Sequence, residues 1–144
     1  MKNYQDIQNI LGKNHFSFKV EEPLDFYTVA EKGLAASVIQ NFKASFSLGL
    51  SQIAYILSSS EPTLYRRIKE NQSLPQQEAV KLLEATDLFI YGEEVIGNRE
   101  DFFKWMELPN TALGGLKPMK VIGYPEGISK VRELLTRIEY NIYS

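Results

Sequence analysis

Six polar residues between positions 52 and 69 have the side chains that proteins use to contact DNA. They are Gln52, Ser60, Thr63, Arg66, Arg67 and Lys69. Arginine can donate two hydrogen bonds to a guanine edge, lysine neutralises phosphate, and amide or hydroxyl groups can donate to phosphate oxygens. Their spacing fits the two short helices of a helix-turn-helix motif, so the expected chemistry is DNA recognition.

The chain end offers a second candidate contact, made of large amphipathic side chains. The residues are Arg137, Tyr140, Ile142, Tyr143 and Ser144. Aromatic side chains of this kind dominate interface energies when a partner's pocket buries them, and an arginine can pair with carboxylates at the pocket rim. The same residues could instead pack onto their own domain. The sequence leaves both alternatives open.

Other chemistry finds little support in the residue types. The chain has no cysteine and one histidine, His15, so disulfides, thiolate metal sites and multi-histidine zinc sites are excluded. Neighbouring carboxylates at 93–94 and 100–101 do not face each other on a helix. The Gly114-Gly115 pair lacks the spacing of a phosphate loop. We therefore expect a protein that is not an enzyme and has no cofactor or metal.

Composition and charge set the frame for these contacts. With 144 residues the chain can form one domain or two very small ones, and its 44% apolar content is ordinary for a globular protein. The net charge is −2, but residues 32–72 have five basic and two acidic side chains, whereas residues 87–144 have seven basic and nine acidic ones. This asymmetry suggests different partners for the two parts. The absence of long apolar segments predicts a cytoplasmic protein without a membrane span.

The helix-turn-helix residues require two short helices, predicted over 52–57 and 61–70. Ser51 and Ser60 are the expected N-caps. Leu64 and Ile68, four residues apart, would face the core and leave the polar side chains of the second helix largely outward. Ser58 stands where many such motifs have glycine, so we expect a less regular turn. Two packed helices with a solvated basic face fit the same pattern.

Helical periodicity extends over most of the chain and predicts an all-α fold. Further helices are expected over 4–11, 26–32, 35–46, 74–91, 99–106 and 126–140. Ser73 is expected to open the long helix through a capping box, and Gly92 to end it. Asn98 is the expected cap of the next helix. The stretch 15–20 alternates apolar and polar residues and suits an extended segment.

Two stretches resemble a known family. Residues 105–118 form a turn-rich segment with Trp105, Pro109, Asn110, Leu113, Gly114, Gly115 and Pro118. This pattern and the ending Arg-Ile-Glu-Tyr-Asn-Ile-Tyr-Ser resemble the toxin-binding domain of Xre/MbcA/ParS-type antitoxins. The segment 48–69 is similar to the Xre-type helix-turn-helix of that family.

The resemblance implies a division of the chain and a function. It suggests an N-terminal segment of unclear role over 1–25, a helix-turn-helix domain over 26–72, a connecting long helix over 73–92, and a toxin-binding and dimerisation domain over 93–144. It further implies a type II antitoxin that binds its cognate toxin, often of the NAD-consuming RES type, binds operator DNA, and forms at least a homodimer. The alternative is a stand-alone helix-turn-helix regulator whose C-terminal domain dimerises or senses a ligand.

Overall fold

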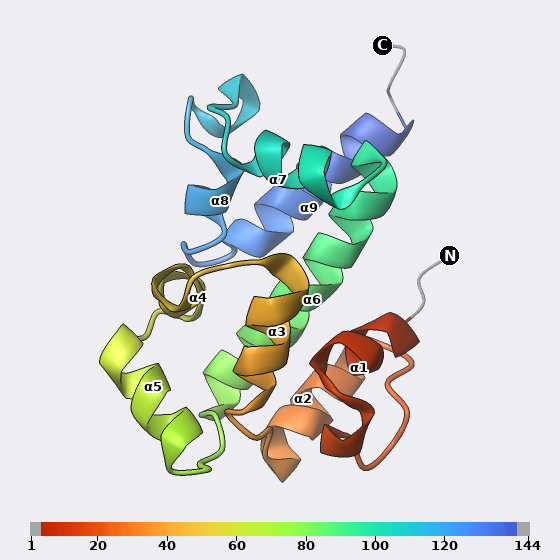
Figure 1. The fold of residues 1–144 in the computed structure, drawn as a ribbon. Coiled ribbons are helices and arrows are strands. Elements are labelled where there is room, and N and C mark those ends of the chain that lie inside the picture. The colour runs from red at the N-terminus through yellow and green to blue at the C-terminus, as the bar shows by residue number, and fades with distance from the viewer. Residues whose placement is uncertain (1–3, 141–144) are drawn as a thin grey trace. The chain divides into compact units, whose positions relative to one another are not determined.

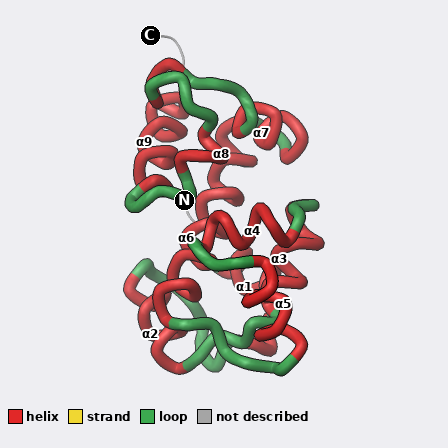
Figure 2. Tube along the Cα trace, turned by 90° about the vertical axis from the view of Figure 1, so that its left-hand side faces the viewer, coloured by secondary structure: helices red, strands yellow, loops and turns green. Residues whose placement is uncertain are grey.

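The computed structural model describes residues 4–140, and within them it contains α-helices, two 3-10 turns and no strand (Figures 1 and 2). The all-α prediction is confirmed for this part of the chain. The α-helices are α1 Gln5–Leu11, α2 Leu24–Lys32, α3 Val38–Phe46, α4 Leu50–Leu57, α5 Glu61–Lys69, α6 Gln76–Ile96, α7 Arg99–Met106, α8 Pro118–Val121 and α9 Gly127–Tyr140. No helix among these is long and apolar enough to cross a membrane. The chain divides into two compact units, 1–87 and 88–144.

In the first unit the N-terminal segment is part of the core. Ile7 and Leu11 of α1 are fully buried, and α1 packs against α3. The Asn41 amide on α3 donates to the Leu11 carbonyl at 2.8 Å, which satisfies the end of α1. Gln8 accepts from the Val20 N–H at 2.8 Å and so ties the extended segment back onto α1. Residues 4–20 therefore complete the fold of this unit.

The helices α4 and α5 confirm the predicted helix pair, with one corrected cap. Ser60 caps α5 as expected, because its Oγ accepts from the Thr63 N–H at 3.2 Å. Ser51 lies inside α4 and does not cap it. The cap position belongs to Gly49, whose N–H donates to the Gln52 side-chain oxygen at 3.0 Å. Helix α4 therefore begins two residues earlier than predicted from the serine.

The turn between α4 and α5 is regular, contrary to expectation. Ser58 adopts φ 55° and ψ 42°, the left-handed conformation that ends many helices. The Ser59 N–H then donates to the Ala54 carbonyl at 2.9 Å, the long bond of a Schellman motif. Serine tolerates this backbone at a cost of about 1 kcal/mol relative to glycine. Ser58 thus keeps the turn geometry that glycine often provides at this position.

Helix α6 begins later and ends later than predicted. Ser73 forms an isolated antiparallel bridge with Ala35. Pro75 disfavours a helical backbone at Leu74, so α6 begins at Gln76. At the other end Gly92 does not stop the helix. It is buried within α6, where the ring of Phe102 occupies the space that a side chain would need.

In the second unit a cluster of aromatic rings joins the end of α6 to α7. Phe89 and Phe102 are fully buried, with ring centroids 5.9 Å apart in an edge-to-face arrangement. Trp105 is half-buried and stacks on Phe102 at 6.3 Å. Val131 and Leu135 are fully buried on the inner face of α9. Asn98 caps α7 as predicted, accepting from the Asp101 N–H at 2.9 Å.

Candidate functional site

The outward face of α5 is the candidate DNA-contact surface. Leu64 is fully buried and Ile68 half-buried, which turns Arg66 and Lys69 to solvent. Neither cation has an ion-pair partner among residues 4–140. The hydroxyl of Thr63 accepts from Ser60 Oγ at 2.7 Å, which leaves its own hydrogen available to a phosphate. Exposed, unpaired cations on a short second helix suit contact with DNA.

Arg67 differs from its predicted outward placement. Its Nη1 lies 2.6 Å from Glu78 Oε1 on α6, and the two side chains are only 18% and 15% exposed. A charge-assisted bond in this half-buried setting fixes the end of α5 on α6. The geometry therefore gives Arg67 a role in holding the helix. Gln52 has a similar local task, since its side-chain oxygen accepts from Gly49 and only its amide nitrogen is left for a phosphate.

Two further residues border this surface and were missed by sequence reasoning. Tyr65 is 59% exposed on α5. Lys43 of α3 lines an apolar hollow together with Tyr65 and Lys69. The exposure of Tyr65 could have been predicted from the helical pattern, because a residue directly after inward Leu64 points away from the core. Lys43 lies 26 positions from Lys69 in sequence, so only the fold reveals that they share a hollow.

The turn-rich segment of the second unit is a closed loop. The Asn110 N–H donates to the Leu116 carbonyl at 3.0 Å, and the Gly115 N–H donates to the Asn110 carbonyl at 2.8 Å. The Asn110 side chain also accepts from the Ala112 N–H. Gly114 and Gly115 have φ of 68° and 85°, which explains both glycines. No atom lies within 4 Å of the position that a Cβ would take at either glycine, so both glycines serve the backbone conformation of the turn.

The remaining motif residues frame this loop. Pro118 is buried at the first position of α8, where its missing N–H costs nothing. Leu113 is half-buried at the end of the 3-10 turn Thr111–Leu113. Pro109 is exposed next to Leu108, which is 60% exposed. The segment thus combines a fixed backbone with apolar groups in solvent.

The end of α9 presents two of the predicted toxin-contact residues. Tyr140 is 76% exposed, and Arg137 is exposed with an ion pair to Glu133 at 2.6 Å. Such an exposed pair within one helix contributes little stability, so Arg137 can exchange it for a partner. Ile142, Tyr143 and Ser144 lie outside the described residues. Within the described part, the packing of Tyr140 onto its own domain is therefore slight.

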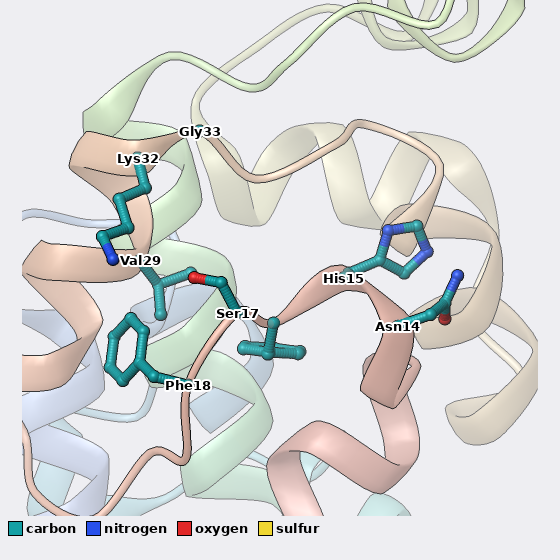
Figure 3. A pocket seen from close by; sticks show the side chains of 8 residues that line it. Asn14, His15, Ser17, Phe18, Val29, Lys32 and Gly33 are labelled. Atoms are coloured by element: carbon teal, nitrogen blue, oxygen red, sulfur yellow. The ribbon is translucent and has the colours of Figure 1, made fainter.

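The first unit has a hollow whose lining includes the histidine and a lysine (Figure 3). His15, Phe18 and Lys32 line it, and the Lys32 ammonium lies 5.1 Å from the centre of the Phe18 ring. A cation over an aromatic face is a packing interaction. No cluster of three metal-binding side chains occurs anywhere in residues 4–140. Ser17 lines the hollow too, and its hydroxyl points away from the His15 ring (Figure 3).

Comparison with known families separates the chain into two matched segments. Residues 25–86 match the antitoxin Xre-like helix-turn-helix domain, and residues 91–140 match the antitoxin Xre/MbcA/ParS C-terminal toxin-binding domain. The chain belongs to the Xre/MbcA/ParS-type antitoxins. The helices α4 and α5 lie in the first match, while the loop of residues 105–118 and α9 lie in the second.

Two relatives of these antitoxins resemble the chain. The Prs ADP-ribosylating antitoxin of Sphingobium sp. (strain YBL2) is 24% identical over 92% of this chain and 91% of its own length. Antitoxin Xre of Pseudomonas putida (strain KT2440) is 29% identical over 53% of this chain and 48% of its own length. The first likeness extends over nearly the whole chain, so it includes both units.

The two neighbouring arginines of α5 give a direct test. Arg66→Ala should weaken binding to the DNA upstream of the gene by about 1–3 kcal/mol if it contacts a base, and reduce the salt slope by about 1 if it contacts phosphate. Its melting temperature should not change. Arg67→Ala should instead destabilise the unit by about 1–3 kcal/mol, because it leaves the Glu78 carboxylate half-buried and unpaired.

Fluorescence anisotropy across salt concentrations and thermal melts would measure both effects. Adding Glu78→Ala to Arg67→Ala should recover part of the lost stability, since the unpaired charge is then removed. Wild-type binding by Arg66→Ala at every salt concentration would exclude this helix as the DNA reader.

Proposed function

We propose that this protein is the antitoxin of a bacterial type II toxin–antitoxin pair. Its first unit binds operator DNA and so regulates its own transcription, and its second unit binds and blocks the cognate toxin. It works in the cytoplasm and has no enzymatic activity of its own. The observation that supports this most directly is the presence, in one chain and in this order, of both antitoxin domain types.

The DNA half of the proposal draws support from the surface of α5. Arg66 and Lys69 are exposed cations without partners among the described residues, and Ser60 and Thr63 place hydroxyl groups at the start of the same helix. The two cations can neutralise phosphates or donate to base edges, and the Thr63 hydroxyl can donate to a phosphate oxygen. The fixed turn at Ser58 and the Arg67–Glu78 pair hold the helix for that contact.

The toxin half of the proposal draws support from the C-terminal domain match and the exposure of Tyr140. We propose that Arg137, Tyr140, Ile142, Tyr143 and Ser144 enter or border the toxin's pocket. We further propose a RES-type, NAD-consuming toxin as the partner. A large aromatic side chain such as Tyr140, which is 76% exposed, contributes strongly to binding when a partner's pocket buries it.

Co-expression with the adjacent gene tests the whole proposal. The product of that gene should arrest growth alone, and this chain should restore growth and copurify with it. Loss of cellular NAD during the arrest would support the RES type. If the chain neither binds nor neutralises that product but still represses its promoter, the stand-alone regulator becomes the better description.

Self-association is expected to depend on the second unit. Helix-turn-helix proteins commonly bind palindromes as dimers, because one motif makes few base contacts. We therefore expect the full chain to be at least a dimer by light scattering, held together by the second unit. A chain ending at Asp87 should be monomeric and bind operator DNA weakly. If this fragment were dimeric, the dimer interface would lie in the first unit.

A further inference from the structure

Tyr91 joins the end of α6 to the last turns of α9. Its hydroxyl lies 2.8 Å from Glu139 Oε1 and 3.2 Å from Thr136 Oγ1. The Arg132 guanidinium lies 4.9 Å from the centre of the Tyr91 ring. These three residues of α9 follow the i, i+4, i+7 spacing, so one face of the helix makes all the contacts. One tyrosine therefore spans the last two turns of α9.

The Tyr91 hydroxyl donates its proton to the Glu139 carboxylate. The Thr136 hydroxyl already donates to the Arg132 backbone carbonyl at 2.9 Å, so towards Tyr91 it can only accept. Tyr91 has a single proton, and a carboxylate is the stronger and here the closer acceptor. Burial raises the pKa of Tyr91, so the hydroxyl keeps its proton at neutral pH. The bond to Glu139 is the principal link.

The neighbouring face of α9 presents the candidate toxin residues. Glu133, Arg137 and Tyr140 each directly follow one of the three residues that contact Tyr91, so they share the next face of the helix. All three are exposed. The last turn of a helix frays easily, because its carbonyls lack partners within the helix. Glu139 immediately precedes Tyr140 at the end of α9. The hydrogen bond from Tyr91 to the Glu139 side chain therefore opposes fraying of the turn that holds Tyr140 in place.

We propose that Tyr91 is a positioning residue for the toxin contact. Through Glu139 it holds the final turn of α9 in helical form, so that Arg137 and Tyr140 are ordered before the toxin binds. The inference rests on the proposed function of the second unit. Ordering a contact in advance raises affinity, because the binding step no longer includes the entropic cost of ordering.

The variant Tyr91→Phe of the full chain tests this role. It keeps the ring under Arg132 and removes only the hydroxyl. Hydrogen exchange of the amides of residues 137–140 should become several-fold faster in the free protein. Binding to the purified product of the adjacent gene should weaken roughly fivefold, the loss equivalent to one net hydrogen bond, with a near-normal melting temperature.

A double-mutant cycle and a matched control complete the experiment. Glu139→Ala should reproduce both effects, and the double variant should bind no more weakly than either single one. Tyr124→Phe removes a hydroxyl from the same unit before α9 begins and should leave affinity unchanged. Wild-type exchange and affinity in Tyr91→Phe, or additive losses in the double variant, would overturn the role. Wild-type protein that fails to bind the product at all would count against the proposed function itself, and this is known before any variant is compared.

Discussion

Replacing Gly92 with alanine should destabilise the second unit, although alanine is the better helix former. A Cβ atom at this position would lie 2.1 Å from Cε1 and 2.5 Å from Cζ of Phe102, whose ring is fully buried. Helix propensity alone would stabilise the variant by about 1 kcal/mol. Overpacking a rigid core costs about 1–3 kcal/mol and occasionally more. The ring contact is so short that we expect a net loss of roughly 2 kcal/mol.

Calorimetry or a circular dichroism melt would measure this loss as a fall in melting temperature of roughly 10 °C. The second-site change Phe102→Leu provides the control, because it removes the ring that the new methyl group meets. The double variant should be more stable than the sum of the two single effects predicts. An increase in stability for Gly92→Ala alone would show that propensity decides and that the close contact does not exist.

Gly92 also illustrates why part of the fold could not be predicted. A glycine after a run of helical residues is a common stop signal, and local sequence cannot distinguish it from a glycine that accommodates a neighbouring ring. The partner ring belongs to Phe102 on the next helix, and only packing brings it there. Helix types and the caps at Ser60 and Asn98, by contrast, depend on neighbours within four residues and were predictable.

The candidate DNA surface shows the same division. The burial of Leu64 and the exposure of Arg66 follow from helical spacing, so they could be predicted from the sequence. The pairing of Arg67 could not be predicted in this way, because its partner Glu78 lies 11 residues away on another helix. Helical periodicity does not relate residues on different helices. The residue types therefore predicted an outward basic face on α5, but not that Arg67 would pair with Glu78 while Arg66 stays exposed.

Removal of residues 140–144 should abolish neutralisation of the toxin while leaving the fold intact. Tyr140 is 76% exposed, so its removal exposes little additional core and should lower the melting temperature only slightly. If the aromatic end is the anchor in the toxin's pocket, its loss should cost at least about 2 kcal/mol of binding energy, or roughly 30-fold in Kd. Growth rescue and copurification with the toxin should both fail.

The two explanations of an apolar chain end make opposite predictions about stability. If these residues packed onto their own domain, the truncated protein would lose rescue because it unfolds, and its melt would collapse. If they bind the toxin, rescue is lost while the melt and operator binding persist. Tyr27→Ala is the matched control, because Tyr27 is also an exposed tyrosine, at 59%, but lies on α2 of the first unit. Full rescue by the truncated chain would exclude the terminal residues from the toxin contact. The loop of residues 105–118 would then be the next surface to test, because its fixed backbone also exposes apolar groups.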